Sequence, residues 1–231
     1  MSSLRLILLD IEGTTLPISF VQKVLFPYAE RTLPTLLREQ ADSPAVRVAL
    51  GDIEREFPGR DPLAQLQDWM AHDVKAAPLK TLQGLAWRSG FESGELRADL
   101  YPDVSPALKA WHDSGLRLAV YSSGSADAQR LLYGYSSNGD LTPLFEAFYD
   151  LDIGGKKVAE SYTEIASRAG LAPQEILFLS DVGAELDAAQ EAGCATCQLI
   201  RPEDGTKPAP GFRHAADLLE VATQFGLPIS S

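Results

Sequence analysis

Short hydrophobic runs alternate with amphipathic stretches through most of the second half of the chain. Runs of this kind, bounded by Gly, Ser or Asp, are typical of strands buried in a parallel sheet. We predict strands at residues 4–9, 116–122, 147–151, 176–180 and 195–200. Helical spacing predicts helices at residues 106–114, 125–133, 160–169, 184–192 and 215–225, with Ser125 as an N-cap. Strands that alternate with helices predict βαβ units and an α/β fold with a parallel sheet.

Residues 19–100 follow a different pattern, because no strand-like alternation occurs in them. Four helix-like stretches cover residues 20–40, 44–57, 62–74 and a segment that begins at Pro78, where proline suits a helix start. Residues 58–62 (PGRDP) predict a turn between two of them, and residues 201–211 predict a loop further on. We therefore predict a catalytic core made of residues 1–18 and 101–231, interrupted by a helical cap at residues 19–100.

The composition narrows the possible partners. The chain has 231 residues, a hydrophobic content of 45% and a formal net charge of −12, so it can bury a sizeable core but should repel nucleic acid and anionic membranes. No stretch reaches the roughly 20 apolar residues of a membrane helix, and no signal peptide is recognisable. We expect a cytoplasmic protein, and any anionic ligand would need local positive charge from a metal ion, a lysine or backbone amides.

Two cysteines occur as Cys194-Ala-Thr-Cys197. A redox pair would favour a helix N-terminus, and zinc would need further ligands. A strand is predicted to follow here, and the three histidines are scattered, so we interpret the cysteines as small side chains entering a strand.

Asp10 and Glu12 lie at the carboxyl end of the first predicted strand, and Gly13 follows. Open α/β sheets bind ligands at this end of their strands. One carboxylate of such a pair can attack phosphorus while the other transfers a proton, and the glycine lets backbone amides approach an anion. The six residues from Asp10 to Thr15 are equally compatible with a simple turn in which Asp10 is a cap and Glu12 is solvated.

Three further segments favour the chemical interpretation. The strand at 116–122 leads into Ser122 and Ser123, the strand at 176–180 leads into Asp181, and Lys156 precedes a predicted helix. Asp10 and Asp181 could share Mg²⁺, which accepts carboxylates, water and phosphate as ligands. Ser122 or Ser123 could bind a phosphoryl oxygen, while Lys156 could supply a positive charge. Each residue alone has an ordinary structural explanation, but all of them together, in this order, favour a phosphate site.

The order of these motifs resembles the haloacid dehalogenase superfamily, and within it the enolase-phosphatases of methionine salvage. The matching strings are Asp10-Ile11-Glu12-Gly13-Thr14-Thr15, Tyr121-Ser122-Ser123-Gly124-Ser125, Gly139-Asp140-Leu141-Thr142-Pro143-Leu144-Phe145, Lys156 with Ser161-Tyr162, and Phe178-Leu179-Ser180-Asp181-Val182. Glu185-Leu186-Asp187-Ala188-Ala189 continues the last string, and Trp87 also matches. The resemblance extends over nearly the whole chain and implies a Rossmann-like haloacid dehalogenase core with a parallel sheet and an inserted helical cap.

The resemblance also implies an activity and a set of site residues. The expected reaction converts 2,3-diketo-5-methylthiopentyl 1-phosphate, by enolisation and then phosphoaspartyl hydrolysis, to the acireductone 1,2-dihydroxy-3-keto-5-methylthiopentene and phosphate. Asp10, Glu12 and Lys156 would be catalytic, and Ser122, Ser123 and Lys156 would bind substrate. Asp10, Glu12 and Asp181 would hold one Mg²⁺ per chain, Glu12 through its side chain or its backbone carbonyl. We expect a monomer whose partner is a small-molecule phosphate.

Four positions depart from the family pattern. Tyr135 replaces a usual His, and Leu151-Asp152-Ile153-Gly154-Gly155-Lys156 stands where the family tends to have Thr-Thr-Ile-Gly-Pro-Lys, which changes residues 151, 152 and 155. A phosphatase of another small phosphate ester is therefore the alternative function. A metabolite-binding protein without activity is a third hypothesis, but it would have no need of a nucleophile, which argues against it.

Overall fold

The computed structural model describes residues 4–72 and 74–229. The chain folds into two compact units. One is formed by the chain up to Ile18 together with the chain from Ala98 onwards, and the other by Ser19–Arg97. Each unit has its own secondary structure and its own core.

The first unit contains a sheet of six parallel strands. The strands are β1 (Leu6–Leu9), β2 (Arg117–Tyr121), β3 (Ala147–Tyr149), β4 (Ile176–Ser180), β5 (Ala195–Leu199) and β6 (His214–Ala215). Their order is β3-β2-β1-β4-β5-β6, and in the centre of the sheet Leu8 pairs with Ala119 on one side and Phe178 on the other. This arrangement confirms the predicted α/β class, and it places β1 between β2 and β4, where the direction of strand succession reverses.

Among the described residues of this unit, four α-helices lie between consecutive strands of the sheet, and a fifth follows the last strand. They are α6 (Val104–Asp113), α7 (Ala126–Gly134), α8 (Ala159–Ala169), α9 (Gly183–Glu191) and α10 (Leu218–Phe225). The predicted N-cap is confirmed, because the Ser125 hydroxyl accepts a hydrogen bond of 3.3 Å from the amide of Ala128. Short 3₁₀ turns occur at Thr142–Leu144, Leu151–Ile153, Pro173–Glu175 and Pro202–Asp204.

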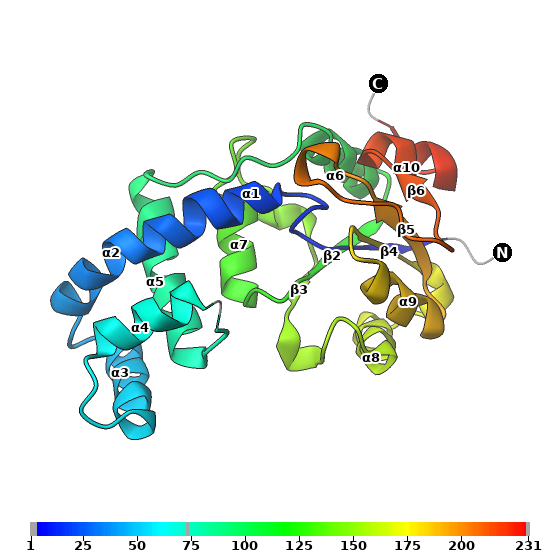
Figure 1. Ribbon diagram of the computed structural model, residues 1–231. Coiled ribbons are helices and arrows are strands. Elements are labelled where there is room, and N and C mark those ends of the chain that lie inside the picture. Colours follow the sequence, from blue (N-terminus) through cyan, green and yellow to red (C-terminus); the bar gives the residue numbers. More distant parts are fainter. Residues whose placement is uncertain (1–3, 73, 230–231) are drawn as a thin grey trace. The chain divides into compact units, whose positions relative to one another are not determined.

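The sheet is buried on both faces, which explains why its strands are continuous apolar runs rather than alternating ones. On one face, Leu8 and Phe178 pack with Tyr162 of α8 and Leu186 of α9, and all four are fully buried. Figure 1 shows α6 and α10 on the opposite face. Burial of each large apolar side chain contributes roughly 1.5–3 kcal/mol to the stability of the fold. This packed core keeps the ends of the strands in fixed positions.

One sequence-based prediction about the end of the chain was wrong. The last helix begins at Leu218 rather than at Ala215, because Ala215 belongs to β6, which pairs with β5. The segment 201–211 contains no strand or α-helix, as expected of a loop, and includes the 3₁₀ turn Pro202–Asp204. A two-residue strand is too short to produce a hydrophobic period, so only its pairing partner reveals it.

The second unit is helical. Its helices are α1 (Ile18–Phe20, which begins one residue before the unit), α2 (Phe26–Glu39), α3 (Pro44–Glu56), α4 (Pro62–Ala71) and α5 (Ala77–Ser93), with a π-helical turn at Val21–Leu25. No strand occurs among its described residues. A common core is formed by one face of each of the four long helices: Ala29, Leu33, Leu36, Val46, Ala49, Ile53, Leu66, Trp69, Leu79, Leu82 and Ala86.

Trp87 of α5 has a structural role within this unit. Its indole Nε1 donates a hydrogen bond of 2.8 Å to the carbonyl of Leu25, the last residue of the π-helical turn. Insertion of a π turn disturbs the regular hydrogen-bond ladder of a helix, and the indole supplies a partner for this carbonyl.

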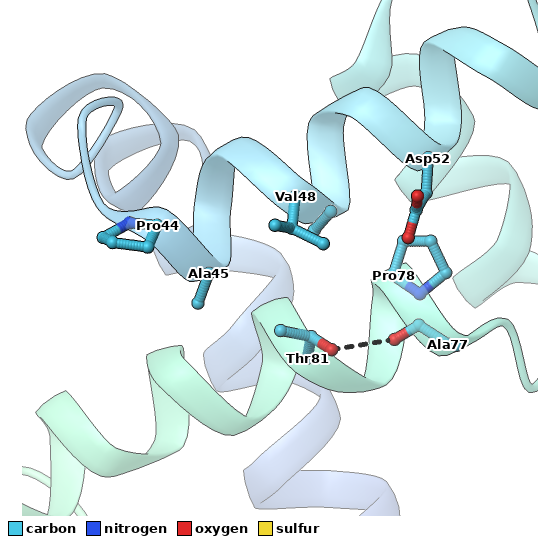
Figure 2. Close-up of a pocket in the computed structure, with 8 residues that line it drawn as sticks. Pro44, Ala45, Val48, Asp52, Ala77, Pro78 and Thr81 are labelled. Carbon is cyan, nitrogen blue, oxygen red and sulfur yellow. Dashed lines mark hydrogen bonds between the residues drawn. The ribbon is translucent and has the colours of Figure 1, made fainter.

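A pocket of about 300 Å³ lies between α3 and α5 (Figure 2). Its lining residues are Pro44, Ala45, Val48, Ala49, Asp52, Ala77, Pro78 and Thr81. Asp52 is the only charged one among them, and it pairs with Arg55 at 2.9 Å. This pocket therefore offers little for the chemistry of a phosphate. Among the described residues, no helix combines the length and the apolar character that crossing a membrane requires.

Candidate active site

Asp10 directly follows β1, and it lies where the order of the strands changes direction. Its amide donates a hydrogen bond of 2.9 Å to the carbonyl of Leu179 in β4, which anchors it between the two central strands. Only 5% of the residue is exposed. A buried carboxylate needs compensating charge or hydrogen bonds, and the surrounding residues supply both.

Lys156 is the compensating charge. Its Nζ lies 2.6 Å from Oδ1 of Asp10 and 2.6 Å from Oε2 of Glu185. Burial by itself would lower the pKa of Lys156, but the carboxylates of Asp10 and Glu185 together raise it above its usual value. The ammonium is therefore charged, and it holds the Asp10 carboxylate through a direct ion pair.

The loop before α8 positions Lys156 through its backbone. The Tyr162 hydroxyl donates to the carbonyl of Lys156 at 2.7 Å, and the Tyr121 hydroxyl donates to the carbonyl of Gly154 at 2.8 Å. Gly154 has φ 131° and ψ −180°, a conformation that essentially only glycine adopts. The lysine thus reaches Asp10 from a loop with a defined shape.

Glu185 was not predicted as a site residue. It lies in the first turn of α9 and is 8% exposed. The Ser180 hydroxyl lies 3.0 Å from Oε2 of Glu185 and 3.4 Å from Oδ2 of Asp10, so it can donate to either carboxylate. Burial, and then the charge of Asp10, raise the pKa of Glu185, while Lys156 opposes the shift. The signal in the sequence is an acidic residue one helical turn after Asp181, and this spacing alone does not distinguish a buried acid from a solvated one.

Asp181 completes the acidic group. It follows β4 beside Gly13, since a β-carbon built on Gly13 would lie 2.6 Å from Oδ2 of Asp181. Burial, followed by the charges of Asp10 and Glu185, raises the pKa of Asp181 to about 7. Three carboxylates therefore face one ammonium, and the excess negative charge is what a divalent cation would neutralise.

The predicted metal ligands fit Mg²⁺ by their chemistry, because they are hard oxygen donors. Among the described residues, no three His, Cys, Asp or Glu side chains converge on one point as a metal site. Asp10 and Asp181 are close to the same loop, whereas Glu12 is exposed. Glu12 offers two further oxygen donors, its side chain and its backbone carbonyl.

Ser122 and Ser123 follow β2, the strand next to β1. The amide of Ser122 donates to the carbonyl of Tyr149 at 3.1 Å, and its hydroxyl accepts from the amide of Gly124 at 3.3 Å. Ser122 is buried and Ser123 is exposed. The structure thus gathers Asp10, Lys156 and Asp181 at the centre of the sheet and places the two serines at the end of the neighbouring strand.

A family model described as haloacid dehalogenase-like hydrolase matches residues 4–193. The chain belongs to the haloacid dehalogenase-like hydrolases and, on the relatives below, to the enolase-phosphatase E1 family within them. It is 64% identical to the enolase-phosphatase E1 of Gluconobacter oxydans (strain 621H) over 98% of this chain and 100% of that protein.

Further similarities agree with this assignment. The chain is 58% identical to the enolase-phosphatase E1 of Gluconacetobacter diazotrophicus over 97% of this chain and 96% of that protein. The crystal structure of the UTR4 protein of Saccharomyces cerevisiae has a TM-score of 0.78 and 35% identity, and the match covers 93% of this chain and 98% of that one. The expected fold, the family and the hydrolase class are therefore confirmed.

Proposed function

We propose that this protein is an enolase-phosphatase of methionine salvage. It would convert 2,3-diketo-5-methylthiopentyl 1-phosphate to the acireductone and phosphate. The observation that carries this proposal is the buried Asp10, which is held by Lys156 at 2.6 Å beside Asp181. The identity of 64% to a protein named enolase-phosphatase E1 supports it.

In the phosphatase step, Asp10 is the proposed nucleophile. A carboxylate oxygen of Asp10 attacks phosphorus, the bond from phosphorus to the substrate oxygen breaks, and Glu12 donates a proton to that oxygen. Glu12 then removes a proton from a water molecule, which attacks the phosphoaspartyl phosphorus and releases phosphate. Lys156, Ser122 and Ser123 bind the phosphoryl oxygens and offset their charge.

We propose that one Mg²⁺ binds per chain at Asp10, Asp181 and the carbonyl of Glu12. When bound, it would polarise an oxygen of the diketone and offset the charge of the phosphoryl group. The excess of carboxylates over ammonium groups at this site supports the proposal. Excess chelator should abolish phosphate release, and added Mg²⁺ should restore it; full activity in excess chelator would contradict a metal requirement.

The enolase step needs a base that removes a proton from carbon. Glu12, which follows the central strand β1, is the first candidate. Lys156 is the other residue that the sequence suggested, but its ammonium is charged beside Asp10 and Glu185 and would have to lose its proton before it could act as a base. If Glu12 is the base, Glu12→Gln should slow enolisation as well as phosphate release. If this variant enolises at the normal rate, the base is a residue other than Glu12.

The decisive assay compares the diketone phosphate with several sugar phosphates. We expect a kcat/KM at least about 100-fold higher for the diketone phosphate, since matched contacts to the rest of a substrate commonly provide discrimination of this size. Comparable rates on several esters would favour the alternative, a phosphatase of another small phosphate ester. The departures at Leu151 and Gly155, which lie just before Lys156, are the observations that keep this alternative open.

The remaining expectations concern the setting in which the protein works. We propose a monomer in the cytoplasm that acts on a free small molecule and binds neither nucleic acid nor membrane. The net charge of −12 supports the absence of polyanionic partners. Light scattering coupled to gel filtration should give a mass near the 25.0 kDa of one chain, and a larger mass would replace the monomer with an oligomer.

A further inference from the structure

Arg201 is a buried charge just after β5. Only 3% of the residue is exposed, yet all five of its N–H donors have partners. The Nη1 and Nη2 atoms each lie 2.9 Å from an oxygen of Asp103, which is a bidentate ion pair. Nη2 and Nε donate to the carbonyl of Thr14 at 2.8 and 3.3 Å, and Nη1 also donates to the carbonyl of Ala216 at 3.2 Å. A guanidinium is the only side chain whose fixed fork can make this set of bonds.

Tyr101 and Asp204 extend these contacts. The guanidinium of Arg201 lies over the ring of Tyr101, 4.0 Å from its centroid. The hydroxyl of Tyr101 donates to Asp204, which also accepts a hydrogen bond of 3.1 Å from the amide of Ile18. We call Arg201, Asp103, Tyr101 and Asp204 the Arg201 cluster.

The cluster holds one short segment of backbone. Besides the carbonyl of Thr14 and the amide of Ile18, the carbonyl of Thr15 accepts a bond of 3.1 Å from the amide of Tyr101. These three backbone atoms lie in residues 14–18, which begin four residues after Asp10 and lead to the start of the inserted unit at Ser19.

The segment is connected to Asp10 by a tight turn. The amides of Thr14, Thr15 and Leu16 all donate to the carbonyl of Ile11, at 3.1, 2.9 and 2.9 Å. The Thr15 hydroxyl lies 3.2 Å from the carbonyl of Asp10 and 2.8 Å from the hydroxyl of Tyr133. The turn is hydrogen-bonded within itself. Contacts that hold residues 14–18 therefore also fix the orientation of Asp10 at its other end.

We propose that Arg201 is a positioning residue for the nucleophile Asp10. It contacts neither the substrate nor the reacting atoms. It connects the turn that follows Asp10 to the end of β5, so that the carboxylate stays aligned with phosphorus during attack. The inference rests on the proposed function only in that Asp10 is the nucleophile.

The test uses Arg201→Lys in the full-length protein. Lysine keeps the charge but lacks the fork, so it cannot hold Asp103 and the Thr14 carbonyl together. We expect kcat to fall by about 10- to 100-fold, the range that a small misplacement of a reacting group produces, while KM changes by less than about twofold. Hydrogen–deuterium exchange without substrate should become faster in peptides that cover residues 11–18.

Arg117→Lys is the matched control. Arg117 also makes a two-point contact with a carboxylate, because its Nε and Nη2 donate to Glu146, the latter at 2.8 Å. It lies at the amino end of β2, the opposite end of the strand from the Ser122 loop. This variant should lose the two-point contact with Glu146 while it keeps the wild-type kcat and the wild-type exchange of residues 11–18.

Tyr101→Phe serves if Arg201→Lys does not fold. It keeps the ring beneath the guanidinium but removes the hydroxyl that contacts Asp204, so we expect a smaller fall in kcat and faster exchange near Ile18. Wild-type kcat together with unchanged exchange in the folded variant would overturn the inference, as would an increase in exchange spread evenly over the whole chain. If the wild type does not act on the diketone phosphate, the proposed function fails. The role of Arg201 is still decided in that case, by comparing kcat of wild type and variants on whichever ester the protein hydrolyses, together with the exchange data.

Discussion

At the scale of single residues, the site is a balance of charges around Asp10. Lys156 lies between the carboxylates of Asp10 and Glu185 at 2.6 Å from each, and Asp181 adds a third carboxylate nearby. A carboxylate held in this way has a fixed orientation, which suits it to attack phosphorus. Removal of Lys156 would be strongly destabilising, since it would leave an unpaired charge in the interior of the fold.

Asp10→Asn should stop the release of phosphate, because an amide cannot form a phosphoaspartyl bond. Its oxygen can still bind Mg²⁺ weakly, so we expect enolisation to survive in part and an ultraviolet-absorbing enol phosphate to accumulate. A stopped-flow trace with a phosphate sensor follows both steps. Asp187→Asn, an exposed change on α9, should behave as wild type. Phosphate release at the wild-type rate by Asp10→Asn would mean that the nucleophile is another residue.

Asp181 should make Mg²⁺ binding depend on pH. Its pKa of about 7 lies above the ordinary 3.8, so below pH 7 the cation must displace a proton and its apparent affinity should fall by about tenfold per pH unit. Titration calorimetry at pH 8 and pH 6 measures this difference. Asp181→Asn should bind Mg²⁺ more weakly at both values and lose the dependence on pH, whereas an equal slope in the variant would assign the titration to another group.

The same raised pKa affects stability without metal. An acid whose folded-state pKa is raised stabilises the protein below its unfolded pKa, and this contribution is lost as the pH rises through the folded value. For Asp181 the loss occurs between about pH 4 and pH 7. In metal-free protein at pH 8, the Asp181→Asn variant should therefore melt no lower than wild type.

At the scale of elements, the chemistry depends on the loops that follow the strands, because each loop has a defined shape. The loop before α8 is the example that a small change can test. Gly154 has φ 131°, and a β-carbon built on it would overlap the Ser161 hydroxyl, which itself donates to the carbonyl of Gly155 at 2.9 Å. The loop can deliver Lys156 to Asp10 only while position 154 has no side chain.

Gly154→Ala should therefore displace Lys156. We expect a loss of about 1–3 kcal/mol in the free energy of unfolding, from backbone strain, and a lower kcat because the ammonium moves away from Asp10. Gly155→Ala is the control, since its β-carbon would meet only Val158, at 3.5 Å. Thermal melting and steady-state kinetics distinguish the two variants, and equal effects at both positions would show that the conformation of Gly154 is not the cause.

At the scale of the whole molecule, the chain forms two units that are joined by two segments, one on each side of Ser19–Arg97. The helical cap that the sequence predicts at residues 19–100 suggests a lid, which would exclude water while the phosphoryl group is transferred. This function stays a prediction. It requires the distance between the units to depend on what the site holds.

Spin labels can test the lid. Both native cysteines are buried, with 6% and 0% exposure, so labels should attach to introduced cysteines alone. Val48→Cys in α3, where 64% of the valine is exposed, and Asp187→Cys in α9 place one label on each unit. Pulsed electron resonance should show a shorter and narrower distance distribution with Mg²⁺ and orthovanadate than without them. An unchanged distribution would contradict a lid that closes.

Much of the fold followed from the sequence alone because local patterns encode it. The apolar run Ile176–Ser180 is observed as β4 with the predicted bounds, and Ser125 caps α7 as expected. The strand-end positions of Asp10 and Asp181 needed only the rule that parallel strands end at one edge of a sheet. The resemblance to a phosphatase family could be recognised for the same reason, since its motifs are short strings at the ends of these strands.

Other features depended on residues that are distant in the sequence. Ala215 belongs to β6 because β5 offers it a pairing edge, and no local period could predict this. Glu185 enters the site because α9 directs it toward a lysine 29 positions earlier in the chain. The Arg201 cluster combines residues from two segments, 101–103 and 201–204, and holds a third, residues 14–18. Hydrophobic and turn patterns act over a few residues, so the sequence determined the elements and the strand-end carboxylates. Burial and charge pairing act through space, and only the tertiary structure decided which side chains compensate one another.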